Sequence, residues 1–175
     1  MEFSTLIKER RSIRKYQEAD ISNDDIMEII KASQLSPSWK NSQTARFYVA
    51  NTAESKAKVK ECLPSFNQNS SDKASYIICT FKKGLSGLLS PDNMSEEKDC
   101  WGAYDLGLNN AYLILKAKEL GYDTLIMGIR DCEGLKKIFD IPEDEMILPV
   151  IAIGKKEGEA VFKERKNTED IAVIR

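Results

Sequence analysis

The sequence predicts a single domain in which helices alternate with strands, of the α/β or α+β class. Two observations support this prediction. Apolar runs of strand length recur between amphipathic stretches along most of the chain. The 175 residues, 42% hydrophobic and 31% charged, also match one ordinary globular domain spanning 1–175, and no linker or internal repeat interrupts them.

The first third of the chain predicts two helices and a polar loop. Residues 2–10 carry a short amphipathic helical pattern. Ser22 begins a second helix, with Asp25 three residues later in the position of a capping box. The inner stripe of this helix is expected to comprise Ile26, Ile29, Ile30 and Leu35. Pro37 cannot continue the helix, so a polar loop is expected over 36–43.

The middle of the chain predicts two strands separated by a helix. Residues 46–50 have strand character, and 53–63 form a helical pattern that Pro64 ends. The polar stretch 65–73 is expected to be a loop. Residues 76–81 form a continuous apolar run typical of a buried strand.

The centre of the second half predicts one long buried helix. Residues 82–98 are rich in glycine, serine and aspartate and predict a long excursion. A helix follows over 99–120, ended by Gly121. Between 101 and 115 it is apolar on nearly every face, which is typical of a helix buried on all sides. In a chain of this size, we expect a second subunit to cover part of it.

The remaining elements are a strand over 123–129, a helix over 133–139 and a strand over 147–153. The tail, 155–175, is charged but ends in the apolar run 171–174. Such an end is unusual for a free tail and is suited to pairing with a sheet.

Composition excludes several classes of function. The net charge of −2 and pI near 5.4 argue against nucleic acid or an anionic membrane as a partner. No apolar run reaches the roughly 18 residues of a membrane helix. The first residues lack the pattern of a signal peptide, so the expected location is cytoplasmic.

The chain contains no histidine, which excludes Ser-His-Asp and Cys-His catalysis and histidine-based metal sites. If the protein is an enzyme, its proton chemistry is modest or a cofactor supplies the reactivity. The spacing of Cys62, Cys79, Cys100 and Cys132 fits no metal motif, and Cys79 is expected to be a buried, inert thiol. Neither G-x-G-x-x-G after a strand nor a GK[ST] loop is present.

A cluster of cations near the start is the most informative local feature. Four lie within residues 10–15, around one hydroxyl: Arg10, Arg11, Arg14 and Lys15, with Ser12. Such a run often only complements the dipole at a helix end. Arginine forks and a serine hydroxyl also suit a phosphate monoester. Ser12 and a second basic group at 163–166 favour the phosphate interpretation.

The loop Ser-Pro-Ser-Trp-Lys-Asn-Ser-Gln at 36–43 also allows two interpretations. It is either a plain turn or a rigid loop that offers amide and carbonyl groups to a flat heterocycle, with Trp39 as a wall. Neither the loop nor the basic cluster is specific when taken alone.

Together, these segments resemble a known family. The run Arg-Arg-Ser-Ile-Arg-Lys-Tyr at 10–16, followed by the loop at 36–43 and a strand, resembles the N-terminal signature of the nitroreductase family of flavoproteins. The resemblance continues in order over nearly the whole chain, through the segments 66–67, 74–75, 107–128, 141–142 and 163–165.

The resemblance implies an α+β fold with a central, mostly antiparallel sheet flanked by helices, in an intertwined homodimer with FMN at the subunit interface. The residues implied for the FMN phosphate and ribityl chain are Arg10, Arg11, Ser12, Arg14, Lys163 and Arg165. Those implied to face the ring from the other subunit are Pro37, Ser38, Trp39 and Asn41. Asn67 would lie near the pyrimidine edge, and Met127 and Gly128 near the flavin face or N5.

The same resemblance implies an FMN-dependent oxidoreductase. NADH or NADPH would be the electron donor, and a nitroaromatic, quinone or related small molecule would be the acceptor in a ping-pong cycle. Because the flavin N5 carries the hydride, no side chain is assigned as catalytic. Trp39 stands where the family usually has a small residue, which keeps open a non-catalytic flavin carrier or sensor. An enzyme that consumes flavin as a substrate is a third possibility.

Overall fold

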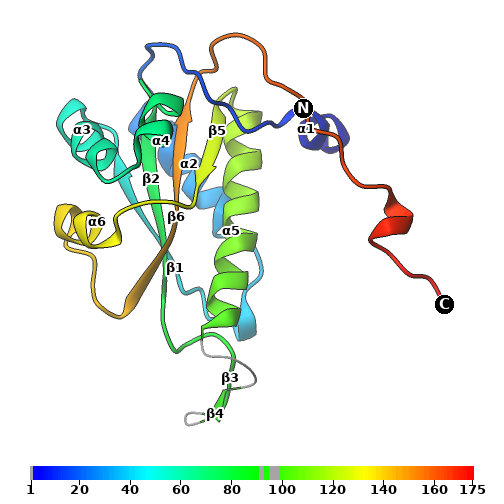
Figure 1. Ribbon diagram of the computed structural model, residues 1–175. Coiled ribbons are helices and arrows are strands. Elements are labelled where there is room, and N and C mark those ends of the chain that lie inside the picture. Colours follow the sequence, from blue (N-terminus) through cyan, green and yellow to red (C-terminus); the bar gives the residue numbers. More distant parts are fainter. Residues whose placement is uncertain (1, 91–92, 95–98) are drawn as a thin grey trace.

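A four-stranded antiparallel sheet forms the centre of the molecule (Figure 1). The computed structural model describes residues 2–90, 93–94 and 99–175. The sheet has the order β1-β2-β6-β5, and each neighbouring pair is antiparallel. Its strands are β1 (Ala45–Ala50), β2 (Ser75–Lys82), β5 (Asp123–Met127) and β6 (Glu145–Gly154). The fold is therefore α+β with an antiparallel sheet, as the resemblance to the nitroreductase family implies.

Helices cover both faces of this sheet (Figure 1). They are α1 (Phe3–Glu9), α2 (Asn23–Ser33), α3 (Ala53–Glu61), α4 (Ser65–Ser70), α5 (Cys100–Glu119) and α6 (Cys132–Phe139). Helices α2 and α5 pack on one face, and α3 and α6 on the other. Short 3-10 turns, η1 (Trp39–Asn41) and η2 (Thr168–Asp170), and the hairpin β3 (Leu88–Ser90) and β4 (Asn93–Met94) complete the described elements.

The alternation of side chains along β2 produces two separate core layers. Ile77, Cys79 and Phe81 pack toward α2 and α5, whereas Tyr76 and Ile78 pack toward α3 and α6. Burial raises the pKa of the Cys79 thiol, which is fully buried. Cys79 is thus the buried, inert thiol that the sequence predicts.

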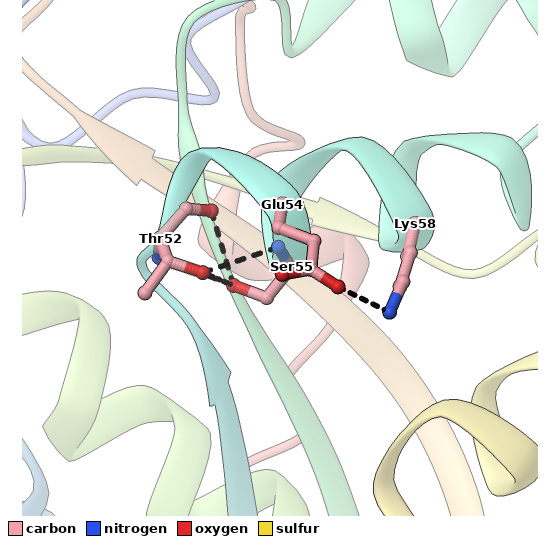
Figure 2. Close-up of polar contacts among 4 residues, drawn as sticks. All are labelled: Thr52, Glu54, Ser55 and Lys58. Atoms are coloured by element: carbon pink, nitrogen blue, oxygen red, sulfur yellow. Dashed lines mark hydrogen bonds and ion pairs between the residues drawn. The ribbon is translucent and has the colours of Figure 1, made fainter.

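Local capping explains where two helices begin. Ser22 Oγ accepts a hydrogen bond from the Asp25 N–H at 3.0 Å, which confirms the predicted start of α2. At the start of α3, Thr52 and Ser55 form a reciprocal capping box, with bonds of 3.2 and 3.1 Å (Figure 2). The ion pair between Glu54 and Lys58, one turn apart, supports the same helix at 2.7 Å (Figure 2).

Two sequence predictions are wrong. The stretch 65–73, expected to be a loop, contains helix α4, whose polar composition hides its period. Helix α3 ends at Glu61, before Pro64, and the carbonyl of Pro64, the N-cap residue of α4, accepts the N–H groups of Asn67 and Gln68. Leu35 does not join the inner stripe of α2, because the helix ends at Ser33 and the Leu35 side chain is 79% exposed.

Both ends of the chain lie outside the sheet. After β6 the chain pairs briefly with residues 15–17, and the tail then leaves the body of the molecule (Figure 1). Its apolar end is exposed, with Ile174 at 98%. Parts of the predicted excursion, 91–92 and 95–98, lie outside the described residues. None of the described helices combines the length and apolar character needed to cross a membrane.

Candidate functional site

The basic cluster lies on an extended segment, not on a helix. Helix α1 ends at Glu9, and Arg10 already has an extended backbone. Ile13 is buried, and its N–H donates to the Thr124 carbonyl of β5 at 3.0 Å. Because side chains alternate along extended backbone, Ser12 and Arg14 on either side of Ile13 are exposed. Arg10 is at the end of helix α1, but the helix dipole does not explain Arg14 and Lys15, which lie further along the extended segment.

This segment forms one wall of a cavity of about 690 Å³, and residues 157–165 form the other. The fold thus brings together the two basic groups that lie far apart in the sequence. The cationic side chains that line the cavity are Arg10, Arg11, Arg14, Lys15, Lys163 and Arg165. Ser12 lines it as well. All six residues predicted for the phosphate end therefore surround one space.

Most of these cations lack an acidic partner. Lys15 pairs with Glu157 at 2.9 Å, but none of the other five makes an ion pair with another described residue. Arg11 and Arg14 bond to carbonyls of their own segment, and the Arg11 guanidinium lies 4.8 Å from the centre of the Phe162 ring. Partial burial, followed by the nearby charges of Arg165 and Arg11, lowers the pKa of Arg10. An anion in the cavity would relieve this repulsion, so the site fits a phosphate monoester.

The loop 36–43 is held in an unusual conformation beside helix α5. Lys40, Asn41 and Gln43 have positive φ angles of 44°, 57° and 49°, a region that favours glycine. Strain of this kind clusters at ligand sites. The Trp39 indole does not stand free as a wall: its Nε1 donates to the Leu88 carbonyl at 3.2 Å, and its ring centre lies 4.7 Å from that of Trp101.

A second cavity, of about 400 Å³, borders this loop on the side of α2 and β1. Ser36 and Ser38 line it, and the Ser36 hydroxyl is buried without a hydrogen-bond partner among the described residues. Ser38 Oγ accepts the Gln43 N–H at 3.1 Å, which closes the loop on itself. Pro37 and Asn41 are exposed. The Ser36 hydroxyl and the exposed Asn41 are therefore polar groups of this loop that a ligand could contact.

Within one chain, the loop and the basic cavity lie at opposite ends of α5. The Trp39 N–H bonds to Asp105, near the start of the helix. Arg11 shares a small cavity with Lys118 and Asp123, near its end. Thirteen residues of helix separate Asp105 from Lys118, which corresponds to about 20 Å. One chain does not bring the two predicted groups together.

The remaining predicted residues gather around the end of β5. Asn67 is buried, and its Nδ2 donates to the Ile129 carbonyl at 3.3 Å. The Met127 side chain lies in the core, so any ligand contact there falls to its backbone. Gly128 is exposed and borders an apolar groove on α5, lined also by Gly107 and Leu148.

Sequence reasoning missed Asp105, whose carboxylate on α5 accepts the Trp39 N–H and so anchors the loop 36–43. The signal was a carboxylate within a helix that is otherwise almost entirely apolar. No group of three or more cysteine, aspartate or glutamate side chains in the described part of the chain is placed to hold a metal ion.

The sequence matches the nitroreductase family over residues 7–155. The chain belongs to this family. A curated relative, provisionally named an NADH dehydrogenase/NAD(P)H nitroreductase of Archaeoglobus fulgidus, is 28% identical over 163 residues, which cover 91% of this chain and 88% of that protein. Membership of the nitroreductase family assigns the chain, in broad terms, to the oxidoreductases.

Solved structures confirm the fold. A provisionally named nitroreductase of Exiguobacterium sibiricum, crystallised in complex with FMN, has a TM-score of 0.88 at 23% identity and covers 100% of this chain and 98% of its own. A provisionally named NAD(P)H:FMN oxidoreductase of Staphylococcus epidermidis has a TM-score of 0.84 at 23% identity, with 99% and 95% covered. The nitroreductase-like α+β fold of this chain is thereby established.

Proposed function

We propose that this chain is an FMN-dependent oxidoreductase that takes electrons from NADH or NADPH and passes them to a nitroaromatic, quinone or related acceptor. The observation that carries the proposal is the basic cavity, where five cations that make no ion pair with another described residue surround one space. The names of the relatives support the donor and the cofactor: one is an NAD(P)H nitroreductase, and another contains FMN. The two half-reactions would follow a ping-pong order.

In this proposal the basic cavity holds the phosphate and ribityl end of FMN. Arg10, Arg14 and Arg165 would give charge-assisted hydrogen bonds to phosphate oxygens, and Ser12 would add a hydroxyl. Arg11 and Lys163 would add positive charge at the same end. When bound, FMN supplies a ring nitrogen, N5, that accepts and donates hydride, which suits a chain without histidine.

Other segments would contact the flavin ring. Pro37, Ser38, Trp39 and Asn41 would meet the ring from the loop 36–43, where Asn41 is exposed and Ser38 lines the second cavity. Asn67 would bond near the pyrimidine edge, beside the backbone of Met127 and Gly128. The task of these groups is to orient the ring and to leave one face open to donor and acceptor.

We infer that the site is completed in an intertwined homodimer. The phosphate end and the ring loop lie about 20 Å apart in one chain, so a second copy is needed to bring them together. The exposed apolar end of the tail, Ile171–Ile174, points away from its own sheet and is suited to a partner (Figure 1). No described segment pairs with the outer edge of β1, which could accept such a strand.

Sedimentation tests the assembly directly. The full chain is expected to have twice the mass of its 19.8 kDa monomer. Removal of 168–175 retains Lys163 and Arg165 but deletes the apolar end, and we expect this truncation to weaken the dimer. A full-length chain that sediments as a monomer at micromolar concentration would contradict the assembly.

A non-catalytic flavin carrier is the alternative that Trp39 suggests. It requires the indole to close the open face of the flavin. The indole is instead held by Trp101 and by the Leu88 carbonyl, so we favour catalysis. The cytoplasmic location and the identity of the acceptor stay predictions.

The experiment is to load the purified chain with FMN and add NADH or NADPH without oxygen. We expect the yellow absorption of bound flavin to bleach rapidly with at least one donor and to return when a quinone or nitroaromatic is added. A chain that takes up no FMN defeats the whole proposal. A chain that binds FMN but is not reduced by either donor is a carrier. Stoichiometric release of reduced flavin would instead indicate an enzyme that uses flavin as a substrate.

A further inference from the structure

Asp105 is a buried carboxylate that binds a loop rather than a cation. Its side chain is on α5, and the residue is only 2% exposed. The Trp39 N–H reaches both carboxylate oxygens, at 3.1 and 3.0 Å, and Ser86 Oγ donates to Oδ2 at 2.6 Å. Burial of a carboxylate is costly unless several donors satisfy it, so this geometry is strongly specified.

The bond from Asp105 is made at the point where the loop becomes strained. Trp39 directly precedes Lys40 and Asn41, the first two residues with positive φ. Non-glycine residues keep such angles only when surrounding contacts hold them. The Trp39 N–H donates to the Asp105 carboxylate. The Ser42 N–H then donates to the Trp39 carbonyl at 2.8 Å, which closes the turn η1.

The same carboxylate joins this loop to a second one. Ser86 is buried, and its Oγ lies 2.8 Å from Ser42 Oγ, so the two loops share a hydrogen-bond chain that ends on Asp105. Trp39 Nε1 adds the bond to the Leu88 carbonyl. The loop 36–43 and the segment 86–88 are therefore joined to each other and to α5 by one set of hydrogen bonds.

We propose that Asp105 is the positioning residue of the ring-binding loop: its carboxylate holds residues 36–43 in the conformation that meets the flavin ring. The inference rests on the proposed function, because it takes the occupant of the loop to be the isoalloxazine. Asp105 lies on the helix beneath the loop and acts through Trp39, and we assign it no contact with the ring itself.

The chain carries its own probe of this arrangement. Its two tryptophans, Trp39 and Trp101, face each other with ring centres 4.7 Å apart and an angle of 48° between the planes. Indoles this close couple electronically, so their circular dichroism depends on the placement of the loop. This signal can be read on the protein without flavin and without any turnover.

Glu145 provides a matched control. It is also a buried carboxylate, 4% exposed, and it accepts hydroxyl bonds from Tyr48 at 2.9 Å and Thr80 at 2.5 Å. It holds strands of the sheet and no part of the loop. Glu145→Gln should therefore disturb a buried carboxylate to a similar degree without moving Trp39.

The experiment compares wild type, Asp105→Asn, Asp105→Ala and Glu145→Gln by circular dichroism, by thermal unfolding and by titration with FMN and with riboflavin. Asp105→Ala should abolish the coupled tryptophan signal. It should also lower the affinity for FMN and the affinity for riboflavin by the same factor, about 10-fold or more. Asp105→Asn keeps one acceptor oxygen for the Trp39 N–H and should give an intermediate loss of about 3-fold. Glu145→Gln should leave the signal and both affinities at wild-type values.

Three outcomes would overturn the inference. They are an unchanged tryptophan signal in both Asp105 variants, unchanged flavin affinity in both, or an equal loss in Glu145→Gln. If Asp105→Ala does not fold, the isosteric Asp105→Asn variant decides alone. If the wild-type chain binds neither flavin, the proposed function is wrong, and the role of Asp105 is wrong with it. If the wild-type chain binds flavin and the Asp105 variants bind as well as wild type, only the role of Asp105 is wrong.

Discussion

The two ends of the candidate site are built in opposite ways. At the phosphate end, exposed or half-buried arginines extend from two segments, and Arg11, Arg14 and Arg165 donate to carbonyls one or two residues away. At the ring end, a strained loop is fixed by a buried carboxylate and by the contact between two indoles tilted against each other. The first end is a matter of charge and should respond to salt and to single cations. Binding at the second end depends on packing, so it should respond to substitutions in helix α5, which supports the loop.

The largest expected effect is a difference in the free energy of unfolding between a substitution near the ring end and one at the phosphate end. Leu106 follows Asp105 on α5, is fully buried and packs among the residues between α5 and the sheet. Leu106→Ala should lower the free energy of unfolding by about 2–5 kcal/mol through the cavity it leaves. Arg14→Ala, on the exposed segment, should change it by no more than about 0.5 kcal/mol.

Urea unfolding of both variants measures this difference. Equal losses of stability would mean that the phosphate end is as tightly integrated as the ring end, and the contrast between them would be wrong.

The next effect concerns flavin affinity. Arg14 lines the basic cavity, is exposed and has no acidic partner among the described residues. Arg14→Ala should remove one charge-assisted bond to the phosphate, worth about 1.5–3 kcal/mol. FMN binding should therefore weaken while riboflavin binding stays unchanged, since riboflavin has no phosphate.

Titration of the two flavins side by side provides the measurement, with Lys31→Ala on the exposed face of α2 as a control outside the cavity. We make the same prediction for Arg10→Ala. If both variants bind FMN as tightly as wild type, the phosphate assignment is wrong.

The smallest effect has the opposite sign. Glu157 lines the basic cavity and pairs with Lys15 at 2.9 Å. The hydrogen bond and charge of Lys15 lower the pKa of Glu157 below its usual value, so the carboxylate is ionised at neutral pH. Glu157→Gln should release Lys15 and tighten FMN binding by about 2- to 5-fold, without effect on riboflavin.

The pH dependence follows from that shift. The ion pair is fully present above the ordinary glutamate pKa and is lost as the pH falls through the lowered pKa of Glu157. Between pH 7.5 and 8.5, above the second pKa of a phosphate monoester at about 6, the ratio of FMN affinities of wild type and Glu157→Gln should therefore stay constant. A ratio that changes over this range would place another titrating group at the cavity.

Features with a local signal could be predicted from the sequence. The cap at Ser22, the apolar run of β2 and the left-handed Gly121 after α5 each depend on a few neighbouring residues. The basic segment was also visible, because charge is read directly from composition. Its meeting with Lys163 and Arg165 needed the resemblance to a family, since no local rule joins the two ends of a chain.

Features that depend on distant contacts could not be predicted. Helix α4 has six mostly polar residues and no apolar period, and burial of Asn67 beside the Ile129 carbonyl gives it a place in the fold. The role of Asp105 depends on a loop 66 residues earlier in the sequence. The Trp39 indole was expected as a wall for a ligand, but it packs against Trp101, which also lies far away in the sequence.

The most direct test of the central claim is the affinity of the wild-type chain for FMN relative to riboflavin, measured at low ionic strength. If the basic cavity binds the phosphate, FMN should bind at least about 10-fold more tightly, and added salt should narrow the difference. Equal affinities for the two flavins, or no binding of either, would contradict the account.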